Sequence, residues 1–507
     1  MSLENFSAIY LLTFFFWILT FNKRLFFWFW LWQLKEYHLG RFKAHFQTDK
    51  GKQLVLNKFL AGKIIVLLGF LLTPFFFSAP TFNLFAASLA ILLSIYLIEG
   101  TKVIVDMFKK RLKSPVLTKK TVLIIGLSFL AQFLFLEHVL KYFFISILLL
   151  DILSPFIASF FVGLIHPLTV FWRWQIIKKA KEKRSKFKDL IVIGITGSYG
   201  KTSTKEILAH ILSKKFKVLK TKKHQNSEVG VSQCVLNELT LEHEVFVVEM
   251  GAYNRGGIKL LSHIVSPKIG ILTGINEQHM VTFKSLENII KTKYELIESL
   301  PKDGTAFFNG RNEYCLELFQ KTNIKKSLYG ENVELAGMEN IEGAKAVARE
   351  LGMTNEEIDQ ACEEIKSKFP GLQLKKGING LNIIDASYSA NPDSLISHLD
   401  YLKTLPAKKI IVMPCLIELG KAAKKVHNRI GERIGKVSHL VIITTKDYFE
   451  EIKKSAISSG FPKENILYIE DPKKIIEKIK EFSKPGDIVL LEGRIPLKTK
   501  LSLIIEN

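Results

Sequence analysis

Cysteines and acidic residues are both scarce in this 507-residue sequence, and each scarcity argues against a class of protein. The four cysteines, Cys234, Cys315, Cys362 and Cys415, have neither CxxC nor metal-site spacing. We therefore expect no disulfide framework, and we expect the protein to lie in a reducing compartment. Asp and Glu number 48 against 71 Lys and Arg, which leaves a formal net charge of +23.

Most of this positive charge lies in residues 1–190. That stretch holds 25 Lys and Arg against 9 Asp and Glu, so 25 − 9 = +16 of the +23 falls there. Because long apolar runs accompany the charge, the pattern indicates a membrane and no nucleic acid. The first residues are not basic and further apolar segments follow, so a cleaved signal peptide is not expected.

Five apolar segments predict a multi-pass transmembrane region over residues 1–170. Several are shorter than the roughly 20 residues that cross a bilayer, so the count could be four to six. Loops 35–63 and 102–120 each carry seven Lys and Arg. The positive-inside rule then puts the N-terminus outside and the catalytic half in the cytoplasm, which five crossings satisfy. The segments are 6–21, 64–78, 82–98, 121–136 and 143–165.

Two features of this half have more than one interpretation. Residues 171–188 join aromatic residues to a basic run, as either an interfacial helix on anionic membrane lipid or a solvated linker. Asp151 lies inside the fifth segment, where it could mark a polar pathway. A hydrogen bond between helices is the simpler interpretation of Asp151, and we favour it.

From Asp189 onward, short apolar strands alternate with amphipathic helices. This rhythm predicts an α/β fold: a P-loop-type parallel-sheet central domain over 189–332, then linker helices and a Rossmann-like domain over 333–507. The dinucleotide fingerprint GxGxxG is absent. The predicted strands are 190–196, 217–220, 244–249, 268–273 and 305–309, then 381–385, 408–413, 439–444, 465–469 and 487–491.

A glycine-rich turn at residues 194–203 lies between a strand and a helix. Backbone N–H groups and the helix N-terminus would cradle phosphate there. Lys201 would reach the terminal phosphates and the Thr202 hydroxyl would bind Mg²⁺. Ile195 stands where the common P-loop has a glycine, and a glycine turn with a surface lysine is the alternative. The other loop residues expected at the nucleotide are Gly197, Ser198, Gly200 and Ser203.

Two further residues follow predicted strands, at the edge where open α/β sheets bind ligands. Glu249 ends the apolar run 245–249, and its hard oxygen suits Mg²⁺. His279 follows the strand at 268–273, and a structural histidine is the equal alternative. Lys293 lies on the next helix, and its spacing alone indicates a solvated lysine.

In this order, these residues resemble the Mur ligase family, ATP-dependent amide ligases of peptidoglycan precursor synthesis. The resemblance covers roughly residues 187–505 and is strongest to the member that adds D-alanyl-D-alanine, MurF. The motifs that carry it are 196–203, 248–252, 385–394, 417–420 and 486–491.

The resemblance implies roles for the candidate residues. Lys201 would hold the ATP phosphates, while Thr202 and Glu249 would hold Mg²⁺. His279 would hold a second metal. Lys293 falls where several members carry a carbamylated lysine that supports this metal.

The resemblance also implies nucleotide contacts and a reaction. Asn309 falls at the adenine, and Tyr388 and Asn391 would close over the nucleotide from the C-terminal domain. A substrate carboxylate would attack the γ-phosphate of ATP, and an amine would displace phosphate from the acyl phosphate.

The sequence departs from the family mainly on the substrate side. Ala386 replaces an aspartate, Ser389 an asparagine, Leu372 an arginine and Glu492 a lysine, and Pro414-Cys-Leu replaces Gly-Asp-Met. Membrane segments also stand where the family has its UDP-sugar-binding domain.

The leading hypothesis is a membrane-anchored ligase for a peptidoglycan-type precursor and an amino acid or dipeptide amine. UDP-MurNAc-tripeptide with D-Ala-D-Ala, or a related membrane-presented precursor, is the expected pair. A Mur-type ligase with another acceptor, poly-γ-glutamate synthase-like or precursor-amidating, is the first alternative. The second is a non-catalytic ATP-binding scaffold, which a functional Lys201→Ala variant would favour. A transporter ATPase is less favoured, because no second Walker-type site is evident.

Overall fold

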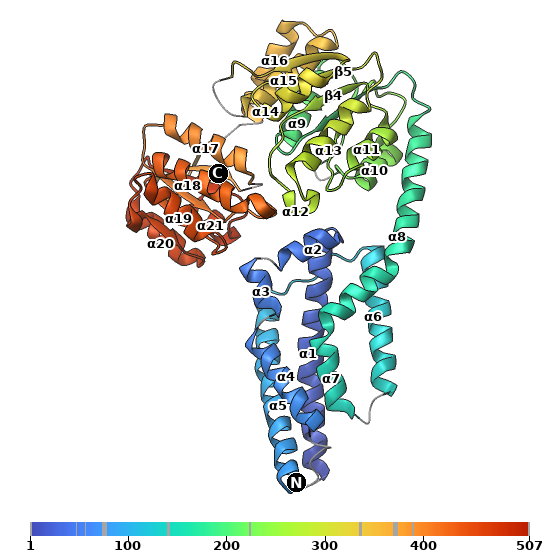
Figure 1. Cartoon of the computed structure of the whole chain (residues 1–507), viewed down its shortest axis with the longest axis vertical. Coiled ribbons are helices and arrows are strands. Elements are labelled where there is room, and N and C mark those ends of the chain that lie inside the picture. Colours follow the sequence, from blue (N-terminus) through green and yellow to red (C-terminus); the bar gives the residue numbers. More distant parts are fainter. Residues whose placement is uncertain are drawn as a thin grey trace. The chain divides into compact units, whose positions relative to one another are not determined.

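The chain forms two compact units, Met1–Trp172 and Arg173–Asn507. In the computed structural model the first unit is helical, and the second contains two six-stranded sheets (Figure 1). The residues that the structure describes are 3–46, 48–55, 57–72, 79–138, 142–222, 225–333, 337–368, 374–387 and 390–504.

The first unit contains five helices that are long and apolar enough to cross a membrane, counted over the described residues. These are Ile9–Leu34, Gly51–Leu72, Ala87–Phe108, Lys119–Glu137 and Ser154–Arg184. The apolar helical region expected from the sequence is therefore present. The helices are α1 (Leu3–Leu34), α2 (Leu39–His45), α3 (Asp49–Val55), α4 (Lys58–Leu72), α5 (Ala79–Phe108), α6 (Lys119–His138), α7 (Phe143–Ile152) and α8 (Ser154–Arg184).

The fifth apolar segment, 143–165, is not one helix as predicted. It divides at Leu153 into α7 and α8. Pro155 explains the break, because proline has no N–H to continue α7 but fits the first turn of a new helix. The carbonyl of Leu153 instead accepts the first bonds of α8, from the N–H groups of Phe156 and Ile157, each at 2.9 Å.

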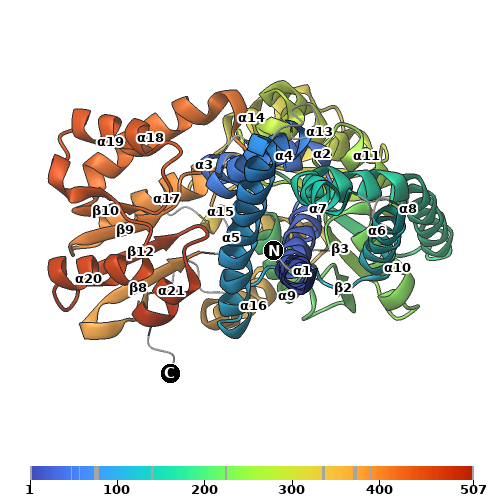
Figure 2. The same cartoon turned by 90° about the horizontal axis from the view of Figure 1, so that it is seen from below.

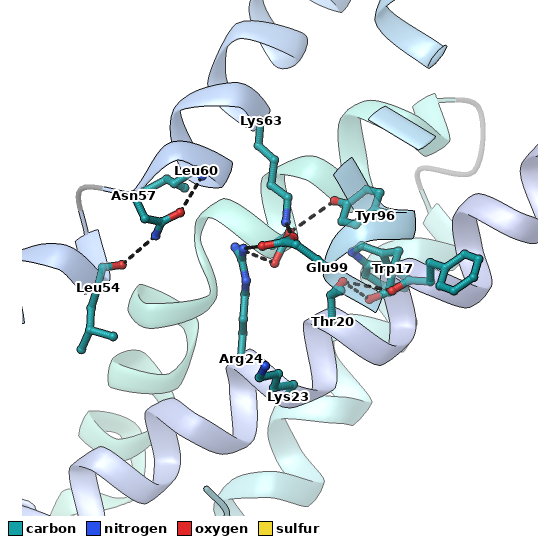
Figure 3. A network of polar contacts seen from close by, with 12 residues as sticks. Trp17, Thr20, Lys23, Arg24, Leu54, Asn57, Leu60, Lys63, Tyr96 and Glu99 are labelled. Atoms are coloured by element: carbon teal, nitrogen blue, oxygen red, sulfur yellow. Dashed lines mark hydrogen bonds and ion pairs between the residues drawn. The ribbon is translucent and has the colours of Figure 1, made fainter. Parts of the chain in front are cut away.

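A charge-balanced cluster joins four helices of the first unit, and Figure 3 shows Arg24, Lys63 and Glu99 pointing toward one another. Lys63 forms ion pairs with both Glu99 and Asp151. Arg24 pairs with Glu99 and, at 3.2 Å, with Asp151, to which Tyr96 donates a hydrogen bond of 3.3 Å. Asp151 thus connects helices, as the favoured interpretation predicts, but it does so mainly through ion pairs. Two cations balance two carboxylates, so no net charge is buried.

The central sheet of the second unit is parallel, with strand order β2-β3-β1-β4-β5-β6. Its inner strands β1, β3, β4 and β5 are buried on both faces, as their apolar runs predict. Val192 and Phe246 pack into one core, and Ile193 and Val247 into the other. The elements are β1 (Ile191–Thr196), α9 (Lys201–Leu212), β2 (Val218–Lys220), α10 (Glu228–Glu238), β3 (Val245–Glu249), α11 (Gly257–Val265), β4 (Ile269–Leu272), α12 (Met280–Phe283), α13 (Leu286–Glu298), β5 (Thr305–Asn309), α14 (Glu313–Lys321) and β6 (Lys325–Tyr329).

Two helices, α15 (Met338–Glu350) and α16 (Asn355–Lys368), separate this sheet from the next along the chain. The second sheet has the order β11-β10-β9-β12-β8-β7, and only β7 is antiparallel. Figure 2 shows it between α18 and α19 on one face and α20 and α21 on the other. Its elements are β7 (Leu374–Lys376), η3 (Ile378–Gly380), β8 (Asn382–Ala386), α17 (Pro392–Thr404), β9 (Lys409–Met413), η4 (Gly420–Ala422), α18 (Ala423–Val437), β10 (Leu440–Ile443), α19 (Phe449–Ser458), η5 (Lys463–Asn465), β11 (Ile466–Tyr468), α20 (Pro472–Phe482), β12 (Ile488–Glu492) and α21 (Leu497–Leu503).

The predicted fold class, an apolar helical region followed by two α/β domains, is therefore confirmed. All ten predicted strands are present, whereas β6 and β7 were not predicted.

The end of α8 packs into the central domain. Ala180 is fully buried in one of its two cores. The guanidinium of Arg184 donates to the carbonyls of Val265 (2.9 Å), Phe187 (2.7 Å) and Leu190 (3.2 Å). Residues 171–184 are thus helical and fixed at their end to the central domain, while lipid contact by their aromatic start stays a prediction.

Candidate active site

The glycine turn occupies the point where β1 ends and α9 begins. Gly200 precedes α9 with φ 77°, a left-handed conformation, and offers no side chain to cap the helix. The first N–H groups of α9 therefore remain available to an anion. A Cβ at Gly200 would lie 2.5 Å from Asn340 Oδ1, and one at Gly197 would lie 2.1 Å from Thr273 Oγ1. Only glycine fits either position without displacing its neighbour.

Lys201 folds back across this loop. Its Nζ donates to the carbonyls of Gly197 (2.8 Å) and Ser198 (3.2 Å). Burial lowers the pKa of Lys201, while the charge of Glu249 opposes that shift. The ammonium group therefore lies within reach of any phosphate cradled by the loop. Ser198 holds the loop in place, because its Oγ accepts a bond of 3.1 Å from the N–H of Asn276.

Thr202 and Glu249 lie side by side at the sheet edge, because β1 and β3 pair with Ile195 opposite Glu249. The Thr202 hydroxyl donates to Glu249 Oε2 at 3.0 Å, and Asn226 Nδ2 donates to Oε1 at 2.9 Å. A hydroxyl and a carboxylate are hard oxygen donors that suit Mg²⁺. Within the described ranges no group of three His, Cys, Asp or Glu could hold a metal. An ion here would thus take its remaining ligands from phosphate oxygens and water.

His279 is held between two parts of the second unit. Its Nδ1 lies 2.6 Å from Glu418 Oε2, and the Tyr253 ring meets its edge with centroids 5.1 Å apart. Burial lowers the pKa of His279, and the charges of Lys293 and Lys201 lower it further against the pull of Glu418. The lowered pKa favours the neutral imidazole, the form that binds metals.

Lys293 is buried on α13. Its spacing alone indicates a solvated lysine, so the structure differs from that interpretation. Burial first, and the charge of Lys201 second, lower the pKa of Lys293 to about 7. Its Nζ lies 5.8 Å from the centre of the Phe283 ring. An amine with such a pKa is partly neutral at neutral pH and can react with CO₂, so carbamylation of Lys293 stays a prediction.

A cavity of about 300 Å³ adjoins the phosphate loop at Tyr199. Asn309 contributes to its wall but is itself almost fully buried. Asn309 Nδ2 donates to the carbonyl of Thr273 at 2.7 Å, and Oδ1 accepts from the N–H of Arg311 at 3.0 Å. This residue therefore shapes the wall of the cavity. The cavity is also lined by Ile275, Asn276, Glu277, Arg311, Asn312, Glu313, Tyr314, Glu339, Asp393, Ile396, Ser397 and Arg429.

Asn391 precedes α17 and connects the two sheet domains. Its Oδ1 accepts from the N–H of Ser394 at 3.1 Å and from Asn276 Nδ2 at 3.0 Å. Ser203 is exposed on α9. Tyr388, the remaining residue predicted at the nucleotide, lies outside the described residues.

Several residues at the site were not singled out from the sequence, and two of them join the two sheet domains. Glu418 and Asn276 both bond across the domains, although a motif containing Glu418 was noted. On the substrate side, Glu492 is fully buried and its Oε2 lies 2.6 Å from His398 Nδ1. Ala386 stands opposite Glu492 in the sheet, while Leu372 and Ser389 lie outside the described residues.

The second unit matches two family models, the Mur ligase middle domain over residues 195–379 and the Mur ligase glutamate ligase domain over residues 372–495. A UDP-N-acetylmuramoyl-tripeptide–D-alanyl-D-alanine ligase of Bacillus subtilis is 27% identical over 338 residues, or 61% of this chain and 74% of that protein. The ligase of the same name from Borreliella burgdorferi is 31% identical over 345 residues, which cover 59% of this chain and 68% of that protein.

Solved structures agree in fold. MurF ligase from Thermotoga maritima in complex with ADP is 25% identical with a TM-score of 0.55, covering 65% of this chain and 84% of that one. MurF from Acinetobacter baumannii is 22% identical with a TM-score of 0.57, and the match covers 65% of this chain and 79% of that one. With its phosphate loop, its two sheets and these relatives, the chain belongs to the Mur ligase family of ATP-dependent ligases.

Proposed function

We propose that this protein is an ATP-dependent ligase that joins a carboxylate to an amine in peptidoglycan precursor synthesis. The observation that carries the proposal is the placement of Lys201, Thr202 and Glu249 around one phosphate loop. The charge of Lys201 lowers the pKa of both His279 and Lys293, which supports placing these two residues in the same neighbourhood. ADP in the Thermotoga maritima relative supports an adenine nucleotide as the ligand.

Each residue has a task in handling the triphosphate. The N–H groups of α9 and the Lys201 ammonium would bind the phosphate oxygens and stabilise the charge that develops during transfer. Thr202 Oγ1 and Glu249 would hold Mg²⁺. Bound Mg²⁺ supplies charge neutralisation at the phosphates. His279, with a carbamylated Lys293, would hold a second ion.

The chemistry takes two displacements. A carboxylate oxygen of the first substrate attacks the γ-phosphorus, the bond from that phosphorus to the ADP oxygen breaks, and ADP leaves. The amine nitrogen then attacks the acyl carbon, the bond from carbon to phosphate oxygen breaks, and phosphate leaves as the nitrogen loses a proton. Positioning and charge neutralisation supply most of the catalysis in phosphoryl transfer.

The relatives are named for UDP-N-acetylmuramoyl-tripeptide and D-alanyl-D-alanine, and we take this pair as the leading substrates. A related precursor presented at the membrane is equally compatible with five apolar helices in the first unit. We propose that the protein is a multi-pass membrane protein with its catalytic half in the cytoplasm.

One observation favours a second candidate of the same class. Glu492 is buried and paired with His398 at a position where the family pattern has a lysine. An anion there would disfavour a carboxylate-bearing amine donor, which supports a ligase with a different acceptor or donor.

The test is amine-dependent ADP release by the full-length protein in detergent, with carboxylate and amine pairs that include the leading one. We expect a product whose mass equals that of the carboxylate substrate plus the amine minus one water, identified by mass spectrometry. Lys201→Met should abolish release, whereas Lys188→Met, at an exposed position before β1, should not. Failure of the wild-type protein to bind MgATP would refute the proposal.

A further inference from the structure

Glu418 lies in the C-terminal sheet domain but contacts a residue of the central domain. We infer that Glu418 is a positioning residue that holds the His279 imidazole by Nδ1 and leaves Nε2 as the nitrogen that binds a metal. The inference rests on the proposed function. It assigns part of the second metal site to the C-terminal domain, so this site is complete only while the two domains are in contact.

The contact geometry supports a directed hydrogen bond. The Nδ1–Oε2 distance is 2.6 Å, and the Glu418 side chain is only 9% exposed. An Nδ1–H that donates to a carboxylate fixes the tautomer and raises the basicity of Nε2.

The backbone holds both partners in place. His279 has φ 65° and Glu418 has φ 66°, so each lies in the left-handed region that costs energy for residues other than glycine. The N–H of Val281 donates to the carbonyl of Glu418 at 3.2 Å. This backbone bond beside the side-chain pair locks the two loops against each other.

A second bridge reaches the same loop three residues earlier. Asn276 Nδ2 donates to Asn391 Oδ1 at 3.0 Å, so the C-terminal domain holds the loop after β4 at two points. The loop carrying His279 is therefore fixed from the domain that must close over the nucleotide. Metal binding at His279 and domain contact should be coupled.

The electrostatic surroundings give Glu418 a further role. Lys201, and Lys293 as long as it is an unmodified amine, both lower the pKa of His279. Glu418 is the anion that opposes these cations at the imidazole. Its removal would leave the ring free to rotate, and a cation would then bind less tightly.

The experiment measures Mn²⁺ binding to the full-length protein in detergent by electron paramagnetic resonance, with AMP-PCP as the nucleotide. We expect two classes of Mn²⁺, of which His279→Ala removes one. Glu418→Ala should weaken that class by roughly 10–100-fold, as loss of a second-shell partner does. Glu418→Gln retains an acceptor for Nδ1–H, so its loss should be smaller.

The controls separate positioning from folding. Glu432→Ala removes an exposed carboxylate on α18 and should leave both classes unchanged. The double variant His279→Ala/Glu418→Ala should bind Mn²⁺ as His279→Ala does, because Glu418 acts through the imidazole. AMP-PCP affinity and the melting temperature should be close to wild type in Glu418→Gln.

Several results would overturn the inference. These are wild-type Mn²⁺ binding in Glu418→Ala, additive losses in the double variant, equal loss of AMP-PCP affinity, or a single Mn²⁺ class in the wild-type protein. Each of them leaves the ligase function standing. Absence of AMP-PCP binding by the wild-type protein would instead refute the proposed function itself.

Discussion

Lys293 is buried, and its amine has a pKa of about 7. Below that pH the ammonium form predominates, and above it the neutral amine predominates. Only the neutral amine adds CO₂, so a carbamate at Lys293 should form as pH rises through about 7 and be lost as pH falls. Its neighbour Lys291 is exposed and pairs with Glu287, at 2.5 Å on the same helix.

Lys293→Ala should therefore lose most of the ADP release, and short carboxylates such as acetate should restore part of it by replacing the carbamate. In CO₂-depleted buffer, added bicarbonate should raise wild-type activity more at pH 8 than at pH 6. Lys291→Ala is the matched control and should behave as wild type. Full activity of Lys293→Ala without added carboxylate would contradict the role.

Gly200 and Gly256 form a matched pair for testing the phosphate loop. Both precede helices with left-handed φ, 77° and 81°, but a Cβ meets Asn340 at 2.5 Å only at Gly200, since nothing lies within 4 Å at Gly256. Alanine should cost about 1–2 kcal/mol of left-handed strain at either position. Gly200→Ala should cost more and weaken MgATP binding, whereas Gly256→Ala should spare it. Thermal unfolding and nucleotide titration would test this, and equal behaviour would contradict it.

At the scale of elements, the cluster of Arg24, Lys63, Glu99 and Asp151 ties α1, α4, α5 and α7 together. Charges inside a membrane are expensive unless they are paired. Removing one partner leaves its counter-charge buried, while removing one charge of each sign restores balance.

Lys63→Met should therefore destabilise the protein in detergent or nanodiscs by about 3–5 kcal/mol, the range for breaking a buried pair. The double variant Lys63→Met/Glu99→Gln should recover part of this, because Arg24 can still pair with Asp151. Lys58→Met, at an exposed position of α4, is the control. A double variant that is less stable than Lys63→Met in a melting experiment would contradict the charge-balance argument.

The strands found from the sequence were those with apolar runs that two cores bury, such as β1 and β3. The two that were missed lie at sheet edges. β6 reads Lys-Lys-Ser-Leu-Tyr and is mostly half-buried, and β7 is a three-residue antiparallel strand. An edge strand needs fewer apolar residues, so its pattern resembles a loop.

The residues of the candidate site also differ in how far the sequence predicts them. Lys201, Thr202 and Glu249 could be placed because each lies at or shortly after the carboxyl end of a parallel strand. Glu418 could not be paired with His279, because the contact joins residues 139 positions apart and neither periodicity nor spacing encodes it.

At the scale of the whole molecule, the distribution of charge predicts how the chain crosses a membrane. Loops 35–63 and 102–120 carry seven Lys and Arg each. With five crossings both loops and the second unit lie on one side, and the connection between α6 and α7 lies on the other. The ligase proposal requires this orientation, since ATP and cytoplasmic precursors must reach the phosphate loop.

Labelling of single introduced cysteines in intact cells would test this orientation. Cys234, Cys315 and Cys415 are buried and Cys362 is partly exposed, so a Cys362→Ser background should show little labelling. In that background a membrane-impermeant maleimide should label Tyr142→Cys, whose position is 56% exposed before α7, without permeabilisation. Lys113→Cys should react only after permeabilisation. The opposite pattern would place the phosphate loop outside the cytoplasm, away from its nucleotide, and the ligase proposal could not stand.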